Sequence, residues 1–134
     1  MKNLFPTKEI YKVKSKPINP DELGEPHSAD EFFKRGMAYY ARQKYDEAVE
    51  DFHHSLSLDK AAIDPYYGLG MVYKALSKNE KAKQAFLEVI SLISAHADVN
   101  STKYHMLRRL ALGHINMIEH GDWNLEKEIW KRIA

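Results

Sequence analysis

Histidines and carboxylates are the side chains that could carry out chemistry here, because the 134-residue chain contains no cysteine. The absence of cysteine removes disulfides, thiolate catalysis and cysteine-based zinc sites. Of the seven histidines, only His53 and His54 are close in sequence. Neighbours on a helix diverge by about 100°, so these two do not readily share one metal ion. We therefore expect surface histidines, no metal site and no cofactor.

The carboxylates and glycines form no enzyme signature either. Glu47 and Asp51 lie one helical turn apart, and we interpret them as part of a solvated face rather than a catalytic pair. Gly68 and Gly70 form only a G-L-G fragment, and the sequence has no G-x-S-x-G, P-loop or G-x-G-x-x-G pattern. These observations predict a protein that is not an enzyme and has no catalytic residues.

The composition is that of an ordinary globular protein. Hydrophobic residues make up 44%, charged residues 29%, and the net charge is +1. This balance predicts no general attraction to nucleic acid or to an acidic membrane. The sequence has no apolar run long enough for a membrane span or a signal peptide, so we expect a cytoplasmic location.

The elements that position these side chains are predicted to be helices after residue 28. Residues 1–28 contain four of the five prolines, which favours an extended segment. Three helix starts follow: a capping box at Ser28 and Glu31, Asp64 before Pro65, and Ser77 with Glu80. Loop signals at 96–102 and 121–124 precede two further helical stretches. The pattern indicates six helices in three hairpins and no strand.

A repeat of 34 residues organises the helical part. Gly-Met-x-Tyr occurs at 36–39 and again at 70–73. The same shift aligns aromatic and small residues in pairs: Phe32 with Tyr66, Ala48 with Ala82, and Phe52 with Phe86. A fixed period of this length is typical of helical repeat proteins.

These residues resemble the tetratricopeptide repeat (TPR), whose pattern is W-x2-L-G-x2-Y, then A-x3-F, then P. The resemblance gives a domain over 29–134 with repeats at 29–62, 63–96 and 101–134. The third is degenerate, built on Leu112-Gly113 and the sequence GDW at 121–123. Arg35 stands where leucine is usual, and Lys60 where proline is usual. The family implies an all-α, right-handed superhelical solenoid of three antiparallel helix hairpins, preceded by the extended Pro-rich segment.

The resemblance also implies that the first helix of each repeat lines a concave peptide-binding groove. We expect nine residues to face it: Phe33, Met37, Tyr40, Tyr67, Met71, Lys74, Leu110, His114 and Met117. Lys74 and His114 would be its polar groups. An alternative is that the row is partly core. Phe33, Met37 and Gly68 occupy positions that are polar in TPR proteins that clamp acidic C-terminal tails, which favours an apolar or amphipathic peptide.

Three functions stay open at this point. The first is a protein-interaction module or scaffold with a protein or peptide partner. The second is a homo-oligomeric structural protein, such as a homodimer, whose groove is filled by its own N-terminal segment with Leu4, Phe5, Ile10, Tyr11 and Val13. Its interface would be on the last helix, at Leu125, Ile129, Trp130 and Ile133. The third is a TPR-type secretion chaperone.

Overall fold

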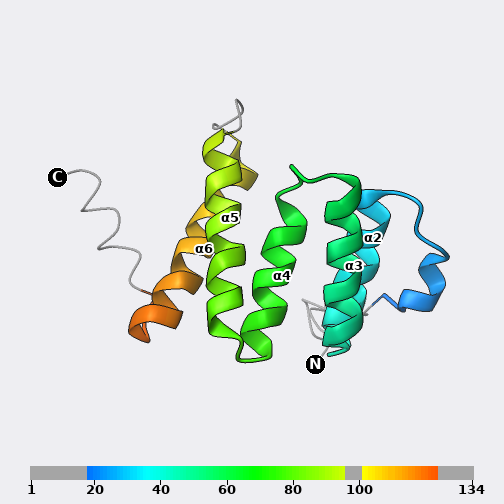
Figure 1. Ribbon diagram of the computed structural model, residues 1–134, viewed down its shortest axis with the longest axis horizontal. Coiled ribbons are helices and arrows are strands. Elements are labelled where there is room, and N and C mark those ends of the chain that lie inside the picture. Colours follow the sequence, from blue (N-terminus) through cyan, green and yellow to red (C-terminus); the bar gives the residue numbers. More distant parts are fainter. Residues whose placement is uncertain (1–17, 96–100, 124–134) are drawn as a thin grey trace, which may run out of the picture.

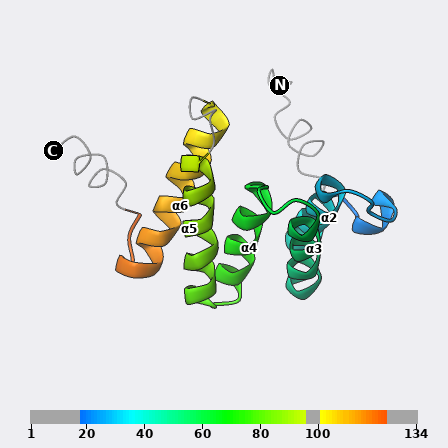
Figure 2. The same cartoon turned by 45° about the horizontal axis from the view of Figure 1, so that its top comes forward.

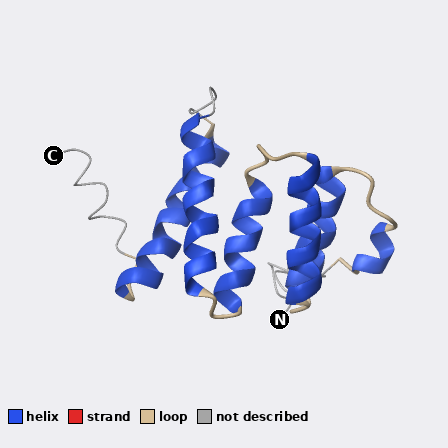
Figure 3. Cartoon of the chain, viewed as in Figure 1, coloured by secondary structure: helices blue, strands red, loops and turns tan. Residues whose placement is uncertain are grey.

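The fold is all-helical, as predicted. The computed structural model describes residues 18–95 and 101–123. Within these ranges Figure 1 and Figure 3 show helices and no strand. The elements are the short 3-10 helix η1 (Pro20–Leu23) and the α-helices α2 (Ala29–Ala41), α3 (Tyr45–Leu58), α4 (Asp64–Ala75), α5 (Asn79–Ala95) and α6 (Thr102–His120).

Local sequence explains where the first two repeats begin. The Ser28 hydroxyl accepts a hydrogen bond from the Glu31 N–H at 3.1 Å, which confirms the N-cap of α2. The Glu31 carboxylate reaches back and accepts from the backbone N–H of His27 at 3.2 Å. Helix α4 begins at Asp64 itself, with Ile63 as its N-cap, one residue earlier than predicted. Pro65 lies in its first turn, where the missing N–H costs nothing.

The predicted capping box at Ser77 and Glu80 is wrong. Ser77 has a left-handed φ of 59°, and its N–H donates to the Lys74 carbonyl at 3.0 Å. The next N–H, that of Lys78, donates to the Tyr73 carbonyl at 2.8 Å. These two bonds form the Schellman ending of α4. Ser77 therefore terminates one helix instead of starting the next.

The same ending recurs 34 residues earlier in the chain. Gln43 has a φ of 61°, and its N–H donates to the Tyr40 carbonyl at 2.9 Å. Lys44 N–H then donates to the Tyr39 carbonyl, also at 2.9 Å. The 34-residue period of the sequence is therefore also a period of the backbone conformation. In both repeats a non-glycine residue adopts the left-handed conformation where the first helix ends.

Glycines let the two helices of each hairpin approach closely. A Cβ atom on Gly36 would lie 2.7 Å from the ring of Phe52, and one on Gly70 would lie 2.5 Å from the ring of Phe86. Both rings are fully buried. A Cβ on Gly68 would also meet Phe52, at 2.6 Å. Phe52 therefore contacts its own repeat and the next one, which stacks the two hairpins.

The hairpins stand side by side in a two-layered array. Helix α3 packs against α2 and α4, and α5 packs against α4 and α6. In Figure 1, α3 and α5 stand in front of α2 and α6, and Figure 2 shows the same order after rotation. The short η1 lies against α2, at the end of the array away from α6. The extended-segment prediction therefore needs one correction within residues 18–28, namely this 3-10 turn.

Two properties of the described residues bear on function. None of the helices in residues 18–95 and 101–123 is long and apolar enough to cross a membrane. The same ranges contain no group of three or more histidine, aspartate or glutamate side chains that could hold a metal ion.

Candidate peptide-binding surface

The nine predicted groove residues form a row across α2, α4 and α6, which we call the inner stripe. Helices α2 and α4 are in direct contact, and side chains of α4 bond to α6. Met37 and Met117 are each 38% exposed. His114 is buried, and the other members are half-buried: Phe33, Tyr40, Tyr67, Met71, Lys74 and Leu110. The structure thus brings the predicted residues onto three neighbouring helices, at different depths.

The aromatic members of the inner stripe also belong to the core. The rings of Phe33 and Phe52 lie 5.9 Å apart, and those of Tyr67 and Phe86 lie 5.7 Å apart. These pairs are equivalent positions of repeats one and two. Burial raises the pKa of Tyr67, and the nearby Tyr40 raises it further. The aromatic side chains therefore form a firm floor, while the methionines are the adaptable part.

His114 departs from the expectation of surface histidines. It occupies the position of Met37 and Met71 in the third unit, but only 7% of it is exposed. Its ring stacks on Phe86, with centroids 4.7 Å apart and planes 13° apart. The ring is therefore packed into the interface of α5 and α6 rather than presented to a ligand.

Two polar groups of α4 satisfy the nitrogens of His114. Lys74 Nζ lies 3.0 Å from Nδ1, and the Tyr67 hydroxyl lies 3.2 Å from Nε2. An ammonium group can only donate, so Nδ1 is the acceptor and Nε2 carries the proton. Burial, and then the charge of Lys74, lowers the pKa of His114 to about 4. The histidine is accordingly neutral at pH 7.

Trp123 closes the third unit over this histidine. Its ring centroid lies 4.8 Å from that of His114, and a Cβ on Gly113 would collide with its indole. Asn116 Nδ2 donates to the Trp123 carbonyl at 3.0 Å. Trp123 therefore packs over Gly113. In the first two repeats Phe52 packs over Gly36 and Phe86 over Gly70 in the same way. The predicted oligomer interface, Leu125, Ile129, Trp130 and Ile133, lies outside the described residues.

An ion pair explains the charged residue in the leucine position of repeat one. Arg35 binds Asp51 through two hydrogen bonds of 2.8 Å, from Nε and from Nη2. Asp51 is only 2% exposed. In repeat two the equivalent positions hold Leu69 and Ala85, both buried. The predicted place of Asp51 on a solvated face is therefore wrong. The sequence does contain evidence of this pairing, because both positions change together at the 34-residue shift, from the charged Arg35 and Asp51 to the apolar Leu69 and Ala85.

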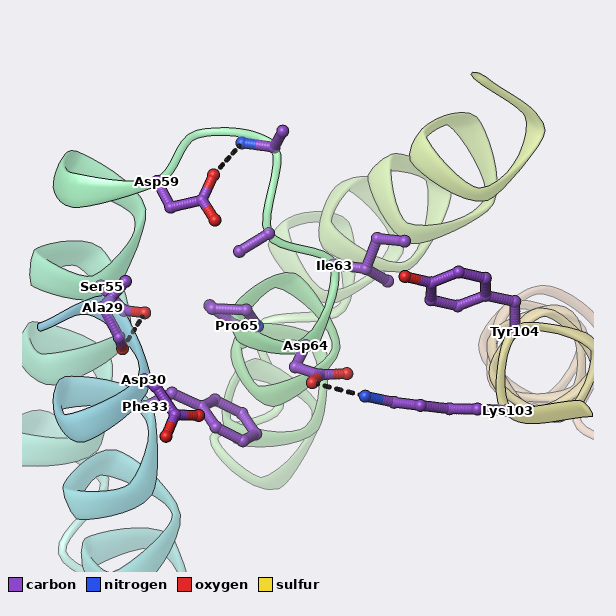
Figure 4. Close-up of a pocket in the computed structure, with 12 residues that line it drawn as sticks. Ala29, Asp30, Phe33, Ser55, Asp59, Ile63, Asp64, Pro65, Lys103 and Tyr104 are labelled. Carbon is purple, nitrogen blue, oxygen red and sulfur yellow. Dashed lines mark hydrogen bonds and ion pairs between the residues drawn. The ribbon is translucent and has the colours of Figure 1, made fainter. Parts of the chain in front are cut away.

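A cavity of about 290 Å³ opens where α2, α4 and α6 begin, and we call it the mouth pocket. Figure 4 shows Phe33 and Pro65 on one side and Tyr104 on the other. Lys103 Nζ reaches across from α6 to Asp64 Oδ2 at 2.9 Å. Phe33 was predicted to be a surface residue, but the pocket could not be predicted, because its other walls come from helix ends and a loop.

The comparisons with known proteins agree with this geometry. A family model described as TPR repeat matches residues 36–77, and one described as Tetratricopeptide repeat matches residues 63–96. The second match has the bounds predicted for repeat two. No curated protein matches the chain. The matched residues contain the recurring helix endings and the Gly70–Phe86 contact, and residues 36–96 consist of tetratricopeptide repeats, which in general form protein-interaction modules.

Proposed function

We propose that this protein is a non-enzymatic interaction module that binds an apolar or amphipathic peptide on the inner stripe. The observation that carries the proposal is the exposure of apolar side chains beside a rigid aromatic floor. Met37 on α2 and Met117 on α6 are both 38% exposed, on two of the three helices that carry the inner stripe. Methionine side chains adapt to varied partner surfaces.

The floor supports this proposal because it limits the entropy lost on binding. Phe33 and Tyr67 are held against buried phenylalanines, so their rings are already in place before a partner arrives. Lys74 adds a cation at the centre, held by His114 and 6.0 Å from the ring of Trp123. A helix or peptide with apolar anchors would fit this arrangement.

Site-specific cross-linking in the native cell tests the proposal. A photoreactive residue replaces Met37 in one variant and Leu87 in another. Leu87 is 46% exposed and lies on α5, outside the inner stripe, so it is the matched control. We expect the variant at Met37 to capture a defined protein partner and the variant at Leu87 to capture none of it. Equal capture at both positions would reject the inner stripe as the binding surface.

A further inference from the structure

Lys74 is the charged member of the inner stripe, and no carboxylate of the described residues pairs with it. Its side chain is half-buried on α4, and its one hydrogen bond goes to a histidine. Other half-buried cations are matched: Arg35 binds Asp51, and Lys83 binds Glu119. A partly desolvated cation without a counterion is costly, and an anionic group from outside would remove that cost.

The ammonium group of Lys74 is held by neutral neighbours. Nζ donates to His114 Nδ1 at 3.0 Å, which uses one of the three N–H donors of an ammonium group. The ring of Trp123 lies 6.0 Å from Nζ and attracts the cation through its π face. These contacts position the charge without neutralising it. The other two N–H donors have no acceptor among residues 18–95 and 101–123 and are free to bind a ligand.

Tyr67 supplies a second donor on the same face of α4. Because Nδ1 of His114 is the acceptor, its Nε2–H donates to the Tyr67 hydroxyl oxygen at 3.2 Å. The hydroxyl proton of Tyr67 then has no acceptor within the described part of the chain. Successive hydrogen bonds polarise one another, so the charge of Lys74 makes the Tyr67 hydroxyl a better donor. The site therefore offers donors from both ends of one imidazole ring.

The fold does not require a cation at this position. At the 34-residue shift Lys74 corresponds to Tyr40 and Tyr67 corresponds to Phe33. In repeat one these uncharged residues lie where α2 packs against α4. A helix of the array can thus contact the next helix without an ammonium group, so the contact between α4 and α6 does not by itself explain Lys74.

The donor set is complementary to a carboxylate. An ionised carboxylate only accepts hydrogen bonds, and bonds from an ammonium group to it are short and strong. A phosphorylated side chain carries up to two negative charges, whereas Lys74 is the single cation of the inner stripe. One carboxylate therefore matches the charge of the site better than a phosphate does.

We propose that Lys74, with the Tyr67 hydroxyl as second donor, binds the carboxylate of an aspartate or glutamate side chain in the partner peptide. The inference rests on the proposed function, because it names the chemistry of that partner at the centre of the inner stripe. Met37 and Met117 lie on the helices to either side, so the partner would carry apolar anchors on both sides of the acidic residue. The carboxylate belongs to a side chain, which distinguishes this site from a clamp for acidic C-terminal tails.

A peptide-display selection on the full chain tests the proposal. The library presents amphipathic helices with fixed apolar anchors and randomised positions between them. We expect the native protein to select aspartate or glutamate between the anchors, Lys74→Arg to keep this preference, and Lys74→Glu to select lysine or arginine instead. Such an exchange of preference does not arise if Lys74 only holds α6 against α4. Native selections without an acidic preference would overturn the proposal.

The matched control is Lys81→Glu, which changes the net charge equally. Lys81 is exposed on α5, 5.6 Å from the ring of Tyr73 and outside the inner stripe. We expect this variant to select the same acidic peptides as the native protein. Loss of the acidic preference in Lys81→Glu would mean that overall charge, and not Lys74, attracts the peptide.

Affinities of one selected peptide and its Glu→Gln form complete the test. We expect the change to weaken binding about fivefold in the native protein and to have no effect in Lys74→Met. The difference should be smaller in Tyr67→Phe and at high salt, because one donor is lost or the charges are screened. Equal weakening in the native protein and in folded Lys74→Met would contradict the assignment, as would tighter binding of a phosphoserine form.

The failure of this inference can be told apart from the failure of the proposed function. If the selected peptides cross-link at Met37 but show no acidic preference, the proposed function stands and this inference falls. A selection that yields no peptide also overturns this inference, and the proposed function then depends on cross-linking at Met37 in the native cell.

Discussion

At the scale of single residues, His114 makes the stability of the protein depend on pH. Its pKa is about 4 in the folded protein and about 6.5 in an unfolded chain. Between these values the unfolded chain takes up a proton that the folded protein excludes, so stability falls as pH falls. The structural reason is that protonation removes the acceptor at Nδ1 and places a second cation 3.0 Å from Lys74.

We predict that His114 alone lowers the free energy of unfolding by about 2 kcal/mol between pH 7 and pH 5. Urea unfolding at the two pH values measures this. The matched variant is His114→Met, which restores the residue found in the first two repeats. Its loss of stability over the same range should be smaller by about 2 kcal/mol. Equal losses in both proteins would mean that His114 titrates normally.

The ion pair of Arg35 and Asp51 provides the second prediction. Arg35→Leu leaves the carboxylate of Asp51, which is 2% exposed, without its partner. We expect this change to cost about 3 kcal/mol of unfolding free energy. Arg35→Leu with Asp51→Ala copies the Leu69 and Ala85 of repeat two and should recover most of the loss. Chemical denaturation of the three proteins checks this, and an unstable double variant would contradict the equivalence of the two sites.

Residue types at the core positions could be predicted from the sequence, whereas their partners could not. Gly36, Gly70, Phe52 and Phe86 follow directly from the repeat. The roles of His114 and Asp51 depend on contacts 40 and 16 residues away, which the period does not contain. A buried polar side chain needs a particular partner, and only the packed structure identifies it.

At the scale of the helices, the repeat acts through its endings as much as through its packing. Helices α2 and α4 end with the same pair of backbone bonds, around Gln43 and Ser77. Helix α6 ends at Gly121, also left-handed at φ 76°. A left-handed conformation costs a non-glycine residue about 1–2 kcal/mol, and glycine avoids this cost. Glycine also loses more backbone entropy on folding than other residues do, so a change to glycine recovers only part of that free energy.

The third prediction follows from these endings. Gln43→Gly and Ser77→Gly should each raise the free energy of unfolding by about 0.5–1 kcal/mol. Thermal and urea unfolding measure the gain. Lys60→Gly, at an exposed loop position without a left-handed backbone, is the control and should give no gain. Destabilisation by all three changes would show that the turn geometry is not as described.

The presence of the described helices could be predicted from the sequence, whereas the residues at which they begin and end could be predicted less well. The Ser28 capping box was identified because its two side chains are adjacent in the pattern. The Ser77 signal was misread because serine followed three residues later by glutamate also occurs where a helix ends. What decides between the two is the backbone conformation, which the Schellman bonds of the preceding helix impose.

At the scale of the whole molecule, two regular helix hairpins and the further helix α6 make a short array within the described residues. The third unit is closed by Trp123 over Gly113 and His114. The array and its repeat period could be predicted from the sequence. The mouth pocket could not, because it is formed jointly by the starts of three helices that are distant in sequence.

The most direct test of the proposed function is the affinity for the partner segment found by cross-linking, measured by titration calorimetry. We predict that Met37→Glu with Met71→Glu weakens binding at least about tenfold, because it places unpaired carboxylates in an apolar contact. Leu87→Glu, on α5, should leave the affinity unchanged, and circular dichroism must show that both proteins are folded. An unchanged affinity in the folded double variant would contradict the inner stripe as the binding surface.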